Sequence, residues 1–100
     1  DMATITNSLA SGSHTLLSAG ELFEDIKAIT FTPSSVGNTA TVSLAIQEKG
    51  TSASFFFIRG LSIKGGNVFV FDNPSMLSYD KGKYNLLITT NQQTQVIVFT

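Results

Sequence analysis

The chain has no cysteine and no tryptophan, only two prolines, and few charged residues. Without cysteine it has no disulfide framework and no thiolate to hold a metal. Charged residues make up 13% of the sequence, about half of the roughly 25% that is usual in a soluble domain. The six basic and seven acidic residues are scattered and give a net charge of −1. This leaves no electrostatic footprint for nucleic acid or an anionic membrane, and we predict neither as a partner.

Long apolar segments are also missing. The longest uninterrupted apolar run is four residues, whereas a membrane-spanning helix needs roughly 20.

A chain of 100 residues is expected to form one domain with a single two-layer core. Threonine, valine, isoleucine and phenylalanine are frequent, and they suit the half-buried surface of a β-sheet. The composition therefore predicts a soluble domain of the all-β class.

The N-terminal stretch, residues 1–13, is mostly small and polar around Ile5 and Leu9. No pattern in it would bury one face of a sheet. We interpret it as a mobile arm with one edge strand from Thr4 to Thr6. The remaining residues, 14–100, are predicted to form a single β-sandwich domain.

The first strand expected within that domain spans residues 14–17, and a turn follows it at 18–21. A helix over the next segment is an alternative, because Ser18 and Glu21 have the spacing of a capping box. We favour a strand, since residues 26–32 are mostly of the β-branched and aromatic types that strands prefer.

The clearest strand signal comes next, where Val42, Leu44 and Ile46 alternate with small or polar residues. Such a strand places one face on the core and turns the other to water. The following apolar segment, residues 55–63, is rich in phenylalanine and isoleucine. Gly60 lies within it and predicts a bulge or a bend.

A glycine turn at residues 64–67 separates this strand from another at 68–71, and we interpret the pair as a hairpin. A phosphate-binding loop is a weaker alternative, because a strand rather than a helix follows the glycines. Further turns lead to two last strands, at 84–90 and 95–99. The sequence thus predicts an antiparallel β-sandwich of seven or eight strands, with jelly-roll or immunoglobulin-like topology.

No catalytic or cofactor-binding set of residues stands out. His14 is the only histidine, which is too little for a zinc site in a chain without cysteine, and no serine lies in a nucleophile-elbow context. Glu24 and Asp25 are adjacent, so on a strand they would point to opposite faces and could not act as an acid–base pair.

A calcium site is a further alternative. Asp72, Asn73 and Asp80 could bring oxygen ligands together from two neighbouring turns. Their spacing matches no calcium loop, and all three residues are common turn formers. We therefore predict that the protein is not an enzyme and that it has no metal and no cofactor.

The phenylalanine-rich strands point to self-association. Alternation along residues 55–58 and 68–71 leaves apolar side chains on both faces of each strand, and one sandwich core covers only one face. We predict an oligomer interface formed by Phe55, Phe57, Val68 and Val70. The alternative is a cover supplied by the N-terminal arm and the long loops of the same chain.

A binding module is the main competing function. In that interpretation, loops at one end of the sandwich recognise a carbohydrate or a host receptor. Tyr79 and Tyr84 would then provide the stacking platform, and the lack of tryptophan counts against it.

A succession of short motifs extends from Leu16 to the end of the chain. It consists of a Thr-Leu-Leu strand with a Ser-Ala-Gly turn, a strand with Ile29 and Phe31, the alternating strand Ala40 to Ile46, the strand–turn–strand segment Leu61 to Asp72, Met76-Leu77 before the Lys81-Gly82 turn, and the strand Tyr84 to Ile88. In this order the motifs resemble the small β-sandwich virion proteins of tailed bacteriophages. Members of that family are capsid decoration proteins, neck or tail components, and domains of fibres.

The resemblance implies a non-enzymatic virion structural protein that packs on other capsid or tail subunits. It also implies a homo-oligomer, for which we expect a trimer, located in the virion and in the host cytoplasm during assembly. It supplies no catalytic residues. A phage protein of unknown role inside the infected host remains an alternative.

Overall fold

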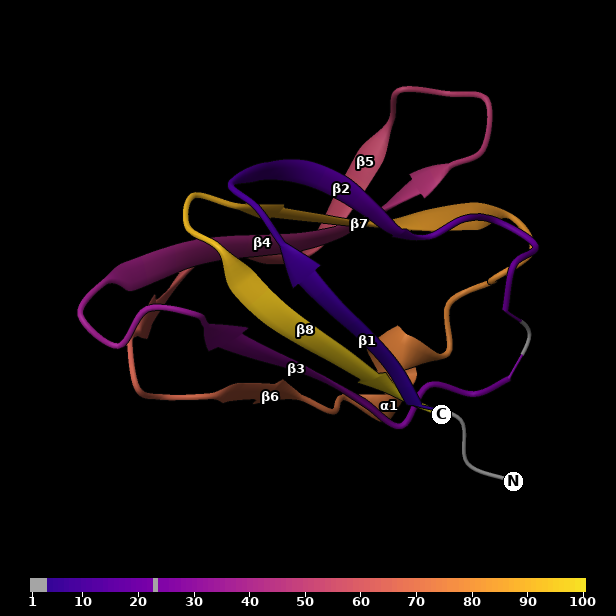
Figure 1. Cartoon of the computed structure of the whole chain (residues 1–100). Helices are drawn as coiled ribbons and strands as arrows, with labels where there is room; N and C mark the ends of the chain where they lie inside the picture. Colours follow the sequence, from indigo (N-terminus) through magenta and orange to yellow (C-terminus); the bar gives the residue numbers. More distant parts are fainter. Residues whose placement is uncertain (1–3, 23) are drawn as a thin grey trace.

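The computed structural model describes residues 4–22 and 24–100, and these form eight strands and one short helix. The elements are β1 (Thr4–Leu9), β2 (Gly12–Leu17), β3 (Ala28–Pro33), β4 (Thr39–Glu48), β5 (Ser54–Lys64), β6 (Phe69–Phe71), α1 (Pro74–Leu77), β7 (Tyr84–Thr90) and β8 (Thr94–Phe99). Two four-stranded antiparallel sheets, β1-β8-β3-β6 and β2-β7-β4-β5, face each other (Figure 1). The predicted all-β sandwich is confirmed.

The order of the strands is that of a jelly roll. The chain pairs β4 with β5, β3 with β6, β2 with β7 and β1 with β8, as in one long antiparallel ribbon folded in half. Rolling this ribbon up adds the pairs β4–β7 and β3–β8 and divides the strands between two sheets. Of the two topologies expected, the structure therefore has the jelly roll.

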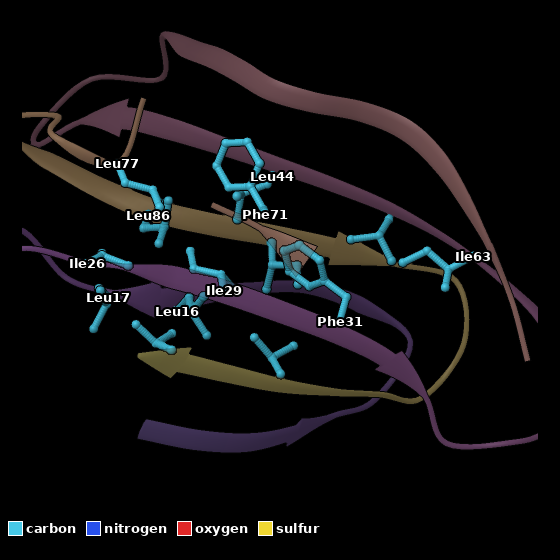
Figure 2. Close-up of a cluster of buried hydrophobic side chains, with 14 of the residues drawn as sticks. Leu16, Leu17, Ile26, Ile29, Phe31, Leu44, Ile63, Phe71, Leu77 and Leu86 are labelled. Atoms are coloured by element: carbon cyan, nitrogen blue, oxygen red, sulfur yellow. The ribbon is translucent and has the colours of Figure 1, made fainter. Parts of the chain in front are cut away.

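The core lies between the two sheets and follows the alternation read from the sequence. From β4, Val42 and Leu44 are fully buried, and Leu44 points inward with the other core side chains drawn in Figure 2. Ile46 is partly buried at the margin of the core. The largest fully buried side chains from the opposite sheet are Phe31 and Ile29 of β3.

The edge strand expected from Thr4 to Thr6 is present and continues to Leu9, so from Thr4 onward the chain belongs to a sheet and not to a separate arm. Strand β1 pairs with β8 over six residues, from Thr4–Phe99 to Leu9–Thr94, and β2 begins at Gly12. Small polar residues are enough to form this strand because β1 is an edge strand with a single neighbour. Its two apolar residues, Ile5 and Leu9, pack against the core. The sandwich thus begins before His14, and residues 1–3 lie outside the described residues.

The helical alternative after Ser18 is not found among the described residues of that segment. Instead a tight turn forms, in which the Glu21 amide donates to the Ser18 carbonyl at 3.0 Å. The Glu21 carboxylate in turn accepts from the Ser18 amide at 2.8 Å. The capping-box spacing therefore stabilises a single turn, and Ile26 beyond it is buried in the core.

The expected hairpin across residues 64–67 is also wrong. The turn itself forms, with the Asn67 amide donating to the Lys64 carbonyl at 3.0 Å. However, β5 and β6 belong to different sheets, so the turn carries the chain from one layer of the sandwich to the other. After β6, Asn73 caps the short helix α1 by accepting from the Met76 amide at 3.1 Å, and Leu77 is buried.

Candidate functional site

Strand β5 departs from a regular strand at two places. Between the pairs Val42–Leu61 and Leu44–Ile58, it contains one residue more than β4. A second extra residue lies between the pairs Leu44–Ile58 and Ala45–Phe56. Gly60 lies in the first irregularity with a φ of +70°, and its amide donates to the Ser43 hydroxyl at 2.9 Å. The bulge predicted at Gly60 is confirmed. Each extra residue shifts the alternation of side chains by one position.

The second extra residue, Phe57, turns toward the interior. Its ring stacks on Phe71 with centroids 5.9 Å apart, and it meets the ring of Tyr79 at 6.0 Å. Phe57 is half-buried and packs against the core cluster. The expectation that it shares an exposed face with Phe55 is therefore wrong, because the bulge places it on the inner side.

The two preceding phenylalanines are the exposed ones. Phe55 is 58% exposed and Phe56 is 47% exposed. They pair with Ile46 and Ala45, successive residues of β4, so they lie on opposite faces of the β4–β5 hairpin. Figure 1 shows this hairpin extending at the upper right beyond the rest of the sandwich. Phe55 therefore occupies a part of the inner face that has no opposite sheet to cover it.

The exposed valines lie at the other end of β5. Val68 and Val70 flank the start of β6 and are both exposed, as is Val36 in the loop between β3 and β4. This loop packs against the glycine turn at residues 64–67. A Cβ atom on Gly65 would collide with three carbonyl oxygens of the loop, and a Cβ atom on Gly66 would contact Val36. We call Val36, Val68 and Val70 the valine patch.

The four residues predicted to form one interface are therefore not brought together. Strand β5 has 11 residues, which span about 30 Å at roughly 3.3 Å per residue. The hairpin with Phe55 is at one end of it, and the turn leading to the valine patch is at the other (Figure 1). The structure thus shows two separate exposed apolar sites.

The predicted tyrosine platform is not open. Tyr79 is half-buried, and burial raises its pKa to about 12. Phe57 contacts its ring, and the ammonium of Lys81 lies 4.9 Å from the ring centroid while donating to the Leu77 carbonyl at 2.9 Å. Tyr84 is also half-buried, with the Lys83 ammonium 5.3 Å from its ring.

Three of the residues weighed as metal ligands, Asn73, Asp80 and His14, make local hydrogen bonds. Asn73 caps α1, and the Asp80 carboxylate accepts from the Gly82 amide at 3.0 Å. His14 Nε2 lies 2.7 Å from the carbonyl oxygen of Ala10. Across residues 4–22 and 24–100, no three histidine, aspartate or glutamate side chains are grouped as metal ligands would be.

A groove that the sequence did not reveal crosses the outer face of the β2-β7-β4-β5 sheet. Its volume is about 390 Å³, and its lining residues are Ser13, His14, Thr15, Ser43, Ala45, Gln47, Ser54, Phe56, Leu87 and Thr89. The sequence did show that alternate residues of β4 face away from the core. It did not show that β2, β5 and β7 place further neutral polar side chains on the same face of the sheet.

Comparisons of this chain with protein-family models, curated proteins and solved structures found no significant match. Within the part of the chain that the structure describes, no helix has the length and apolarity required to span a membrane.

Proposed function

We propose that this chain is a non-enzymatic structural subunit of a tailed-phage virion that self-associates and packs on other capsid or tail subunits. The observation that carries the proposal is the exposed ring of Phe55 on an edge strand, in a hairpin that extends beyond the core. Burying an aromatic side chain at a contact stabilises it by about 1.5–3 kcal/mol. The motif resemblance and the jelly-roll fold, which viral capsid domains also use, support the virion role by analogy.

The separation of the two apolar sites favours a ring over a two-fold dimer. In a two-fold dimer, the same surface patch of both copies meets across the axis. In a ring, one patch of each subunit meets a different patch of the next. Phe55 at one end of β5 and the valine patch at the other provide two such surfaces. We therefore infer a cyclic trimer in which Phe55 of one copy packs on the valine patch of its neighbour.

The test is the absolute mass in solution, measured by light scattering after size exclusion. We expect three subunits for the wild type and one subunit for either Phe55→Ser or the double variant Val68→Ser/Val70→Ser. Met76→Ser is the matched control, because Met76 is an exposed apolar residue outside both sites. It should leave the trimer intact. Circular dichroism should show that each variant remains folded.

Mixing the two monomeric variants tests the ring geometry directly. Phe55→Ser retains its valine patch and the valine variant retains Phe55, so one intact contact can form between them. The mixture should then contain a species of two subunits that neither variant forms alone. A monomeric wild type would overturn self-association, and an oligomer unaffected by Phe55→Ser would overturn the assignment of the surface.

The virion role has a separate test. Mass spectrometry of particles purified from the phage that encodes this chain should detect it in a fixed ratio to the major capsid protein. Its presence only in the infected-cell lysate would favour a role inside the host instead.

A further inference from the structure

The groove on the outer face of β2-β7-β4-β5 has a neutral polar lining. Five of its ten lining residues carry hydroxyl groups, and Gln47 adds an amide. None is a carboxylate or an amine, and His14 is the only ionisable one. Its volume of about 390 Å³ falls within the range of roughly 300–1,000 Å³ that is typical of ligand sites.

Several of these polar groups have no partner within the protein. Among the described residues, the Gln47 amide and the hydroxyls of Thr15 and Ser54 make no side-chain hydrogen bond. The Ser43 oxygen accepts from the Gly60 amide at 2.9 Å, which leaves its own proton free to donate. A hydroxyl both donates and accepts, and an amide side chain does both through separate atoms. A ligand that matches this surface therefore carries many groups that both donate and accept hydrogen bonds.

One wall of the groove is aromatic. Phe56 is about half exposed there, and the Arg59 guanidinium lies 4.8 Å from its ring centroid. Ala45 and Leu87 add apolar surface between the polar side chains. A pyranose ring has an apolar face of C–H bonds and an edge of hydroxyl groups, so it can pack on such a ring while its hydroxyls reach the neighbouring side chains.

From this combination we propose that the groove binds a neutral oligosaccharide. A cationic ligand would find no carboxylate among the lining residues, and the nearest cation, the Arg59 guanidinium, already lies against the Phe56 ring. A neutral polyhydroxylated ligand needs no charged partner and uses the unpaired donors and acceptors. The inference is independent of self-association, because Phe56 faces the groove and Phe55 lies on the other face of the hairpin.

The experiment is an NMR titration of the labelled protein with neutral trisaccharides built from glucose, galactose, mannose or N-acetylglucosamine, at millimolar concentration. At least one should shift the amide signals of β2, β4, β5 and β7 selectively. Gln47→Ala and Phe56→Ala should each weaken that binding about tenfold, the loss expected for one direct contact.

Gln95→Ala is the matched control, since Gln95 is an exposed glutamine on the other sheet, in β8. It should bind sugar as the wild type does. Phe55→Ser should also retain sugar binding, and Gln47→Ala should retain the wild-type mass, which separates this proposal from the oligomer. Absence of selective shifts with all four sugars, or equal losses in Gln47→Ala and Gln95→Ala, would overturn it.

Discussion

Strands β4 and β5 are neighbours in the same sheet, yet they have different roles in the molecule. β4 lies between β7 and β5, and its Val42 and Leu44 are fully buried. β5 is an edge strand with two extra residues, and it presents Phe55 and Phe56 to solvent. The contrast shows that regular alternation builds the core here, whereas irregular spacing determines which apolar residues stay outside it.

The bulges also account for the shape of the edge. A bulge bends a strand and increases its local twist, which hinders another strand from pairing with that edge. In β5 the bend accompanies the hairpin that extends beyond the sandwich (Figure 1). Assembly through β5 would therefore depend on side-chain packing by Phe55 rather than on the addition of a strand.

The largest expected effect comes from the interior of β4. Leu44 is fully buried and lies opposite Ile58 and Ile88, so Leu44→Ala leaves a cavity at the centre of the sheet. We expect a loss of about 2–5 kcal/mol in the free energy of unfolding. Urea denaturation measures it, and Gln47→Ala on the solvent face of the same strand should change stability by less than about 0.5 kcal/mol. Equal effects of the two variants would contradict the assignment of faces in β4.

A smaller effect is expected at the bulge of β5. Gly60 has a φ of +70°, and a Cβ added there would meet no atom within 4 Å. Gly60→Ala therefore costs only the backbone strain of a left-handed residue, about 1–2 kcal/mol. Gly37→Ala is the matched control, because a Cβ there is equally unobstructed and its φ is not in the left-handed region. Urea denaturation that gave the two variants equal stability would show that the bulge is not strained.

The same contrast explains how much of the fold the sequence could predict. The alternation of Val42, Leu44 and Ile46 was enough to assign β4 and its faces, because a regular strand obeys a period of two. Gly60 predicted that a bulge occurs, but a second extra residue at Phe57 has no sequence signal of its own. Its inward position was therefore missed.

Two other features could not be predicted because their causes are not local. The turn chemistry at residues 64–67 is the same whether the next strand returns to its neighbour or crosses to the other sheet. Likewise, β1 continues past the expected Thr4–Thr6 to Leu9 because β8 offers it a free edge, and residues of low strand propensity are sufficient there. The groove depends on four strands meeting on one face, which only the jelly-roll topology determines.

The most discriminating measurement uses the two phenylalanines of β5 that the sequence treated as equivalent. Phe57 covers the ring of Tyr79, and burial raises the pKa of Tyr79 to about 12 from the ordinary 10.0. Phe57→Ala admits water to that ring, so the pKa of Tyr79 should fall toward 10. Ultraviolet titration of the phenolate, in a Tyr84→Phe background that leaves Tyr79 as the single tyrosine, measures it.

Phe55→Ala is the matched control, because Phe55 lies at the exposed end of the hairpin and should leave the pKa of Tyr79 unchanged. The raised pKa also has a consequence for stability. The folded state favours the neutral phenol, so its contribution is fully present below pH 10 and is lost as the pH rises through about 12. Urea denaturation measures the free energy of unfolding across this pH range. Phe57→Ala should narrow the range of pH above 10 over which that free energy falls, whereas Phe55→Ala should not. A Tyr79 pKa that responds equally to both substitutions would mean that the second bulge does not turn Phe57 inward.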